Sequence, residues 1–239
     1  MALIELESLR KVYAIEGVES VALQDISLNI DKGEFVAVMG PSGSGKSTLL
    51  HILGFLDLYT SGKYLFDGRE MSKYTEEEMA HIRNHKMGFV FQSFNLLART
   101  SVLDNVKLPL LYSSIPENQW QKRALEAIEA VGLTHRLNHQ PSQLSGGEKQ
   151  RAAIARALVC DPQVIFADEP TGNLDSKSGQ LVMETIQQLN EKMGHTIVLI
   201  THETYTAETA QRVIRLHDGL VQSDEKVVHR RQAKEHFEK

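Results

Sequence analysis

Eight consecutive residues could bind a phosphate group. The motif consists of Gly40, Pro41, Ser42, Gly43, Ser44, Gly45, Lys46 and Ser47. Its spacing is G-x-x-x-x-G-K-[ST], in which the glycines let backbone N–H groups curl around an anion. Lys46 can reach the β- and γ-phosphate oxygens, and the Ser47 hydroxyl can ligate Mg²⁺. An apolar run at 35–39 precedes the motif and a helical pattern starting at Thr48 follows it, so the context predicts a phosphate-binding loop.

An acidic pair follows another apolar run. Residues 164–167 are Val-Ile-Phe-Ala, and Asp168 and Glu169 come directly after them. Asp168 can hold the Mg²⁺ shell, and Glu169 is the candidate base that polarises or orients an attacking water. Alone, such a pair would be better explained as a loop with a helix cap. Together with the phosphate loop, it indicates the second half of a nucleotide site.

Three apolar runs, at 35–39, 164–167 and 196–200, lack alternation and predict strands that are buried on both faces. The last run is followed by Thr201 and His202. Ligands of open parallel sheets bind at the carboxyl ends of the strands. We therefore expect an α/β fold with a mainly parallel sheet, one edge of which collects the chemistry. His202 on its own could equally be a satisfied surface or core histidine.

A stretch of different character separates the first two of these runs. Residues 117–131 and 145–158 have helical patterning, which predicts a helical lobe over about 94–160. The sheet core would then cover about 1–93 and 161–224, starting with a strand near the N-terminus. A short surface helix is expected at 75–86, where three glutamates favour a helix start. Residues 225–239 are dense in mixed charge and predict a solvated helix or frayed end.

Ser145, Gly146 and Gly147 precede the second lobe helix and could expose N–H groups as another anion site. One chain cannot place this site on its own phosphate. With the phosphate loop and residues 165–171, the segment resembles the ATP-binding subunit of ABC transporters, over about residues 4–221. The resemblance implies a P-loop NTPase (RecA-like) core with an inserted helical subdomain and an N-terminal antiparallel β region. It also implies ATP and Mg²⁺ as ligands, and head-to-tail pairing of two copies.

Position by position, the resemblance assigns further roles. Tyr13 matches the aromatic residue that stacks on adenine, although a tyrosine packed into the core is the other interpretation. Gln92 matches the glutamine that senses Mg²⁺ and the attacking water; the other interpretation is an exposed amide in a loop. Ser145, Gly146 and Gly147 match the γ-phosphate clamp, and His202 matches the histidine that contacts the γ-phosphate. Residues 173–175 match the loop at the dimer interface, whereas Glu148 and Lys149 replace the more frequent glutamines.

Residues 38–50, 88–97 and 167–175 narrow the resemblance to the lipoprotein-release and macrolide-efflux group. Resemblance to this group implies export or extraction of lipoprotein, peptide or drug-like substrates. It also implies an integral membrane permease subunit with a large extracytoplasmic domain. A periplasmic or extracellular adaptor is an optional further partner. The chain would then sit peripherally on the cytoplasmic face of the inner membrane. The same group includes a cell-division ATPase that signals and transports nothing. Residues 94–97 form an apolar patch where a partner helix could dock, or an ordinary part of the lobe core.

Composition weighs against several other classes. The 239 residues hold 26 Lys and Arg against 31 Asp and Glu, a net charge of −5, which is unusual for a protein that binds mainly nucleic-acid phosphates. The single Cys160 provides neither an internal disulfide nor a cysteine-based zinc site. No run approaches the ~20 apolar residues of a membrane span, so we expect a separate membrane subunit and no nucleic acid.

Three alternatives stay open on the sequence. A soluble ABC ATPase acting on DNA or ribosomes would need a long coiled coil or tandem domains, which 239 residues do not accommodate. A GTPase would need an Asn-Lys-x-Asp element and would leave Ser145 to Gly147 unexplained. A regulatory protein that binds ATP without hydrolysing it is opposed by the presence of both Glu169 and His202.

Overall fold

The central element is a six-stranded sheet in the order β10-β9-β3-β8-β7-β6, five of whose strands run parallel. The computed structural model describes residues 2–15 and 18–234. The strands are β3 (Phe35–Met39), β6 (Met87–Phe91), β7 (Val164–Asp168), β8 (Thr196–Thr201), β9 (Arg212–His217) and β10 (Leu220–Lys226). The three strands expected from apolar runs are confirmed. β3 and β8 are buried at every position, which explains why neither alternates.

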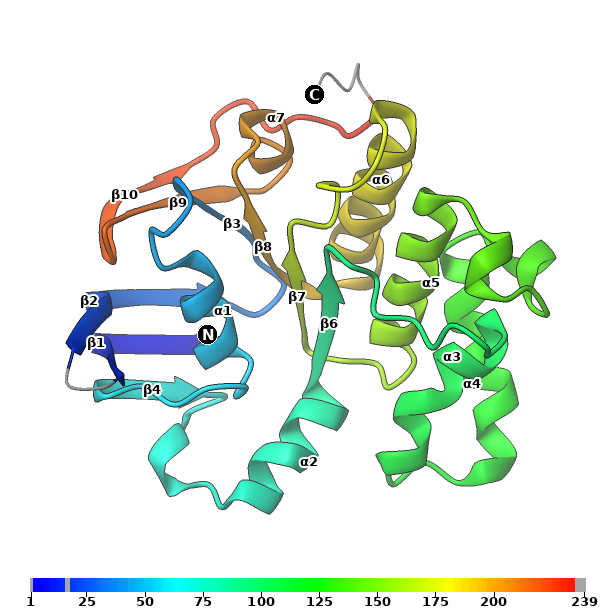
Figure 1. The fold of residues 1–239 in the computed structure, drawn as a ribbon, viewed down its shortest axis with the longest axis horizontal. Coiled ribbons are helices and arrows are strands. Elements are labelled where there is room, and N and C mark those ends of the chain that lie inside the picture. Colours follow the sequence, from blue (N-terminus) through cyan, green and yellow to red (C-terminus); the bar gives the residue numbers. More distant parts are fainter. Residues whose placement is uncertain (1, 16–17, 235–239) are drawn as a thin grey trace.

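A second, antiparallel sheet stands beside the first, in the order β2-β1-β4-β5 (Figure 1). Its strands are β1 (Ala2–Ile15), β2 (Val18–Asp31), β4 (Ser61–Phe66) and β5 (Arg69–Glu70). Helix α1 (Lys46–Leu53) follows β3, and its Leu49 and Leu50 pack in one core cluster with side chains of both sheets. The expected N-terminal antiparallel region is thereby confirmed, and α1 is fixed between two apolar surfaces.

The remaining helices cover the ends and one side of the parallel sheet (Figure 1). They are η1 (Met71–Lys73), α2 (Glu76–Lys86), α3 (Val102–Lys107), η2 (Leu108–Tyr112), α4 (Glu117–Ala130), η3 (Thr134–Arg136), η4 (Pro141–Gln143), α5 (Gly146–Leu158), α6 (Ser176–Met193) and α7 (Thr204–Ala207). The surface helix expected at 75–86 is α2, which begins at the N-cap Thr75 with a capping box from Glu78.

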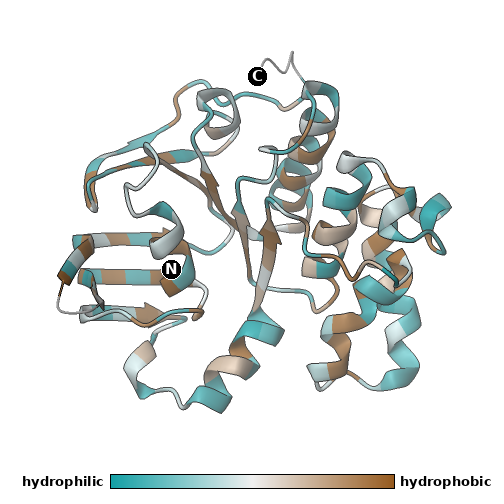
Figure 2. Cartoon of the chain, in the orientation of Figure 1, coloured by the Kyte–Doolittle hydropathy of each residue, from teal (hydrophilic) through white to brown (hydrophobic). Residues whose placement is uncertain are grey.

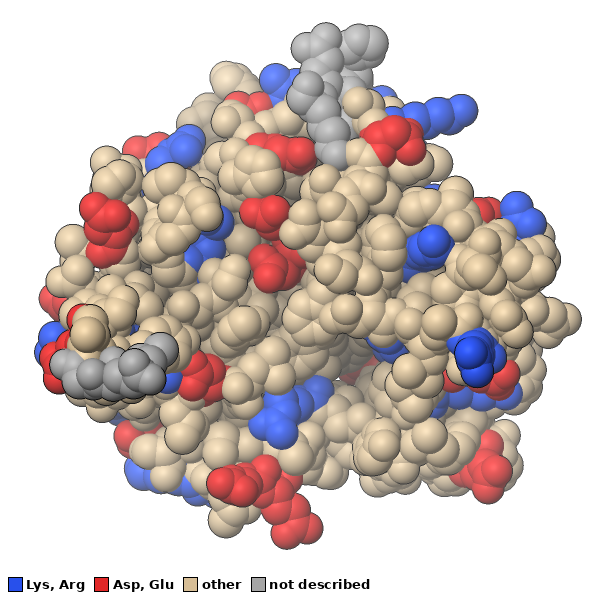
Figure 3. Space-filling view, in the orientation of Figure 1, with Lys and Arg blue, Asp and Glu red and all other residues tan. Residues whose placement is uncertain are grey.

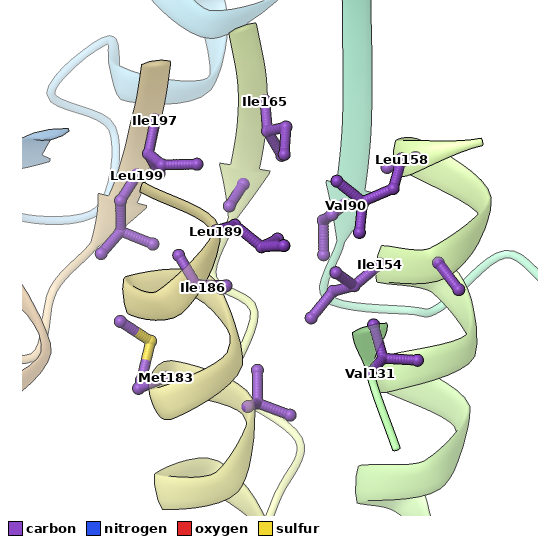
Figure 4. Close-up of a cluster of buried hydrophobic side chains, with 14 of the residues drawn as sticks. Val90, Val131, Ile154, Leu158, Ile165, Met183, Ile186, Leu189, Ile197 and Leu199 are labelled. Atoms are coloured by element: carbon purple, nitrogen blue, oxygen red, sulfur yellow. The ribbon is translucent and has the colours of Figure 1, made fainter. Parts of the chain in front are cut away.

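Helix α5 joins the lobe to the sheet. It contacts α3 and α4 on one side and β6 and α6 on the other. Side chains of the strands, such as Val90 and Ile165, lie in the same cluster as Ile154 of α5 and Ile186 of α6 (Figure 4). A Cβ at Gly88 would lie 2.7 Å from the carbonyl oxygen of Ala157, so glycine is required where α5 approaches β6 this closely. The lobe is therefore packed on the sheet through shared apolar side chains.

Hydropathy follows this packing. Brown, apolar segments line the central strands and the inward faces of α5 and α6, whereas outward helix faces are teal (Figure 2). Among the described residues, no helix combines the length and apolar character required to cross a bilayer.

The expectation of a solvated tail is wrong for residues 225–234. β10 continues to Lys226, and residues 227–234, here called the C-terminal strap, then run across α6 and α7. Ala233 is fully buried, and its N–H donates to the side chain of Gln187 on α6. Arg231 pairs with Glu208 and lies over the ring of Tyr205. Arg230 likewise pairs with Glu191, so the two arginines attach the strap to the body of the protein. Residues 235–239 lie outside the described part.

Candidate functional site

The phosphate-binding motif forms the turn between β3 and α1. Gly43 and Gly45 have φ values of 79° and 97°, a left-handed conformation that glycine adopts without strain. A Cβ on Gly45 would also lie 2.5 Å from the carbonyl oxygen of Ala22. Lys46, only 7% exposed, donates from Nζ to the carbonyl oxygen of Pro41 at 2.7 Å. The lysine is thus folded over its own loop, where a bound phosphate would offer a competing acceptor.

A cavity of about 820 Å³ lies over this turn. It is lined by Ser20, Val21, Ala22, Pro41, Ser42, Gly43, Gly45, Lys46, Ser47, Thr48, Gln92, Asp168, Glu169 and His202. The predicted residues at the ends of β3, β6, β7 and β8 therefore meet at one cavity, as the carboxyl edge of a parallel sheet requires.

Two predicted residues of the loop lie behind the cavity wall. Ser44 is 1% exposed, and its buried hydroxyl has no hydrogen-bond partner among the described residues. Gly40 packs so closely against β9 that a Cβ there would lie 2.2 Å from the carbonyl oxygen of Leu216. Both residues shape the loop from below.

The acidic pair is split between two environments. Burial, reinforced by the adjacent charge of Glu169 and opposed by His51 and Lys46, raises the pKa of Asp168 above its ordinary value. Glu169 stands just past the strand with a left-handed φ of 44°. Its backbone N–H donates to the carbonyl oxygen of Ile200 at 2.9 Å, which anchors the loop after β7 to β8.

Glu169 and His202 are hydrogen-bonded to each other. Oε1 of Glu169 lies 2.9 Å from Nδ1 of His202. An ionised carboxylate only accepts, so this bond places the proton of a neutral imidazole on Nδ1 and leaves Nε2 as an acceptor. The His202 side chain is 59% exposed, whereas that of Glu169 is 25% exposed. The pair can therefore handle a proton at the open side of the cavity.

Gln92 bridges to a different loop. Its Nε2 donates to Oδ1 of Asn173 at 3.3 Å, and Nδ2 of Asn173 donates to the Gln92 carbonyl oxygen at 3.1 Å. A Cβ at Gly172 would lie 2.7 Å from Nε2 of Gln92. The glycine allows this close approach, which joins Gln92 to the segment at 173–175.

The chemistry of the donor set suits Mg²⁺. Ser47, Gln92 and Asp168 all line the cavity and offer a hydroxyl, an amide carbonyl and a carboxylate. Mg²⁺ prefers oxygen ligands and in nucleotide sites uses one or two carboxylates together with phosphate oxygens and waters. The raised pKa of Asp168 is consistent with a cation site, because a buried carboxylate without a cation is poorly solvated.

Tyr13 is not among the residues that line the cavity. Its hydroxyl donates to Oδ2 of Asp57 at 2.8 Å, and the ammonium of Lys11 lies 4.5 Å from the centre of its ring. Burial and the bond to Asp57 raise the pKa of the Tyr13 hydroxyl. Its partner across the β1–β2 pairing is Ser20, which does line the cavity. The side chain of Thr48, which lines the cavity, also hydrogen-bonds with the Tyr13 hydroxyl, so this hydroxyl lies beside the cavity lining.

Ser145, Gly146 and Gly147 also lie outside the residues lining the cavity. They begin α5, where the Ser145 hydroxyl accepts from the N–H of Glu148 at 3.2 Å and Glu148 accepts in return from the N–H of Ser145. The hydroxyl proton of Ser145 is still available as a donor. Arg136 donates to Glu148 at 2.8 Å. Burial alone would raise the pKa of Glu148, but the bonds with Ser145 and Arg136 lower it overall. These bonds explain why an ionised acid is accommodated at this position.

Four residues at or beside the site are absent from the sequence-based prediction. Ser20, Val21 and Ala22 reach the cavity only because β2 pairs with β1 beside the loop, and nothing in their types signals a ligand. Glu203 was passed over although it directly follows His202. Its carboxylate accepts hydrogen bonds from the hydroxyls of Thr171 and Thr206. An acid next to a candidate histidine was the only available signal.

Known proteins are similar to this chain over most of its length. The family described as "ABC transporter" matches residues 23–172. A macrolide export ATP-binding/permease protein of Chlorobaculum tepidum is 51% identical over 94% of this chain, which spans 34% of that protein. An uncharacterised ABC transporter ATP-binding protein of Thermotoga maritima is 48% identical over 93% of this chain and 94% of its own length.

Solved structures are similar over the same extent. A dimeric ATP-binding cassette in a post-hydrolysis state with ADP and Pi has a TM-score of 0.85 and 43% identity, covering 94% of this chain and 98% of that chain. The chain therefore spans about a third of the macrolide-export relative and nearly the whole of the solved cassette.

Proposed function

Because this chain belongs to the ABC transporter family of ATP-binding proteins, we propose that it hydrolyses ATP as a head-to-tail dimer and drives a separate membrane subunit. One observation carries the proposal: the phosphate loop, Asp168, Glu169 and His202 share a cavity, whereas the anion site at 145–147 lies outside it. Each cavity thus has half of a site, and a second copy supplies the other half.

In this proposal the phosphates of ATP lie on the N–H groups of the loop and the start of α1. Lys46 exchanges the Pro41 carbonyl for β- and γ-phosphate oxygens. Ser47, Gln92 and Asp168 would hold Mg²⁺, which would neutralise phosphate charge when bound. Glu169 orients the attacking water and accepts its proton, and His202 contacts the γ-phosphate. Phosphoryl transfer depends mainly on positioning and charge stabilisation, which the fixed strand ends provide.

The partner copy contributes the N-terminus of its α5. The dipole of a helix and its free N–H groups favour a negative group at this end. The capping box leaves the proton of Ser145 free to donate to a γ-phosphate. ATP then bridges two copies, and release of phosphate removes the bridge. In this proposal the ring of Tyr13 stacks on adenine, while its hydroxyl donates to Asp57 in the plane of the ring.

A groove on the lobe side would receive the membrane subunit. It has a volume of about 310 Å³ and is lined by residues of α2, β6, η2 and the end of α5, Phe89, Leu108 and Tyr112 among them. Tyr112 and Leu111 are 76% and 58% exposed. Apolar side chains that are this exposed and adjoin a groove fit an amphipathic helix of the partner.

Arg156 connects this groove to the nucleotide site. It lines the groove and donates to the carbonyl oxygens of Phe94 and Asn95, which follow Gln92. Movement of Gln92 on ATP binding or hydrolysis would therefore displace a residue that the partner helix touches. Leu97, 47% exposed, lies in the same loop and would add to the contact.

The proposed complex lies on the cytoplasmic face of the membrane and exports or extracts lipoprotein, peptide or drug-like substrates. The relatives named as macrolide export proteins support the export of drug-like molecules among these. The membrane subunit would have a large extracytoplasmic domain, with an adaptor as an optional addition. Signalling without transport is the second candidate, since the ATPase part would be the same. Basic and acidic side chains are interspersed on the face drawn in Figure 3, without a continuous basic stripe on that face.

Affinity isolation of the full chain from solubilised membranes tests the proposal. An integral membrane subunit should co-purify with the chain. The ATPase activity of the isolated complex should require Mg²⁺. Recovery of ribosomes or DNA without any integral membrane protein would overturn it. Identification of the co-purified subunit would also decide between transport and signalling.

A further inference from the structure

Glu203 links two loops of the nucleotide site. Its Oε2 accepts hydrogen bonds from Oγ1 of Thr171 at 3.0 Å and from Oγ1 of Thr206 at 2.8 Å. Thr171 is 1% exposed and lies two residues after Glu169, and Thr206 is fully buried in α7. Glu203 itself directly follows His202. One carboxylate therefore connects the loop after β7 with the loop after β8.

The donors of this carboxylate are hydroxyl groups. Among residues 2–15 and 18–234, none of the ion pairs involves Glu203, and its backbone N–H donates to Oγ1 of Thr201 at 3.0 Å. Hydrogen bonds to an ionised acceptor are shorter and stronger than those between neutral groups. Partly burying a carboxylate without a cation is otherwise costly. The carboxylate of Glu203 therefore has a role other than charge pairing. Its place between the two loops points to positioning of those loops.

Two side-chain hydrogen bonds tie this pair of loops together, in addition to the backbone bond from Glu169 to Ile200. The first is the bond between Glu169 and His202, at 2.9 Å. Both of these side chains would have to face the γ-phosphate and the water when ATP is bound, so their mutual bond cannot be the only connection. The second tie, from Thr171 to Glu203, joins the residue two positions after Glu169 to the residue directly after His202.

We propose that Glu203 is a positioning residue: together with Thr171 it holds the loop of Glu169 and the loop of His202 at a fixed separation while the Glu169–His202 bond changes. This proposal rests on the proposed ATPase function. It assigns Glu203 no contact with nucleotide. The effect should fall on turnover and leave ATP binding unchanged, because misplacement of reacting groups reduces the rate steeply.

Steady-state kinetics of the full chain with Thr171→Val test this role, since valine keeps the shape and removes the hydroxyl. We expect kcat to fall about tenfold and the KM for ATP to change less than about twofold. Thr171→Ser should restore kcat. Thr209→Val is the matched control, because Thr209 is also fully buried beside α7 but its hydroxyl donates only to the Thr206 carbonyl.

A double-mutant cycle separates the tie from general destabilisation. Glu203→Ala should reduce kcat at least as much as Thr171→Val, because it also removes the acceptor of Thr206, and the double variant should be no slower than Glu203→Ala alone. Unchanged kcat in Thr171→Val, additive losses, or an equal loss in Thr209→Val would each overturn the proposal.

A readout in the nucleotide-free protein does not depend on hydrolysis. The imidazole nitrogens of His202, followed by NMR, should report a bonded Nδ1–H in wild type and in Thr209→Val, and a weakened bond in Thr171→Val. Identical His202 signals in all three would contradict the positioning role. Absence of wild-type ATP hydrolysis, by contrast, would overturn the proposed function and leave this test standing.

Discussion

Oε1 of Glu169 lies 2.9 Å from Nδ1 of His202, although the two residues are 33 positions apart. They end neighbouring strands, β7 and β8, whose register pairs Asp168 with Ile200. Both side chains line the same cavity as Lys46. The structure therefore holds a carboxylate and an imidazole in contact at the place where the phosphate loop would present the γ-phosphate.

Glu169→Gln should abolish turnover and preserve nucleotide binding. The amide keeps the shape of the side chain but cannot accept a proton from water, and such groups contribute about 10²- to 10⁴-fold to rates. The variant should accumulate as a dimer with ATP, which size-exclusion chromatography with light scattering measures. Glu184→Gln on α6 is the control. Wild-type hydrolysis in Glu169→Gln would exclude the proposed role.

Lys46→Met should weaken ATP binding. The substitution keeps the apolar stem of a side chain that is only 7% exposed and removes its charged donor. Hydrogen bonds from charged groups contribute about 1.5–3 kcal/mol, so the Kd for ATP, measured by calorimetry, should rise about 10- to 150-fold. Lys63→Met, at an exposed lysine of β4 that pairs with Glu7, should bind ATP normally. Unaltered affinity in Lys46→Met would contradict the phosphate-loop assignment.

Asp168→Asn should stabilise the nucleotide-free protein at neutral pH. Burial, with the charge of Glu169, raises the pKa of Asp168. When the pKa of a carboxyl is higher in the folded than in the unfolded state, the free energy of unfolding falls as the pH rises from the unfolded pKa through the folded pKa. Above the folded pKa the whole loss of stability persists. The Tm of the variant should thus exceed that of wild type at pH 7, and the gap should narrow toward pH 4. A lower Tm at pH 7 would contradict the burial argument.

Removal of the C-terminal strap should destabilise the fold. Truncation after Lys226 deletes buried Ala233 and the ion pairs of Arg230 with Glu191 and Arg231 with Glu208. We expect a loss of about 2 kcal/mol or more, or a Tm lower by at least about 4 °C. Truncation after Lys234 keeps every described contact of the strap and should leave the Tm unchanged. Equal Tm values for the two truncations would show that the strap does not dock in solution.

Arg156→Ala should uncouple the membrane subunit from hydrolysis. Its guanidinium holds the carbonyl oxygens of Phe94 and Asn95 beside the groove. Basal ATPase activity of the isolated chain should stay within about twofold of wild type, whereas stimulation by the reconstituted membrane subunit should be lost. Arg123→Ala on α4, at a residue that does not line the groove, should remain stimulated. Full stimulation of Arg156→Ala would contradict the proposed link.

The sequence predicted most of the fold because the relevant signals are local. Apolar runs without alternation marked β3, β7 and β8, and 3.6-residue periodicity marked α4 and α5. The tail was mispredicted for a physical reason. Mixed charge favours solvation when its partners are unknown, and the partners of Arg230 and Arg231 are Glu191 and Glu208, which are distant in sequence.

The sequence by itself determined the phosphate loop, since glycine spacing and a lysine specify how a backbone can surround an anion. It also determined which strand ends carry Asp168, Glu169 and His202. Only the tertiary structure decided that Tyr13 bonds to Asp57 outside the cavity lining, that Ser20 reaches the cavity, and that Glu203 joins Thr171. Those relationships depend on strand pairing and packing between distant segments, for which residue type and spacing contain no local signal.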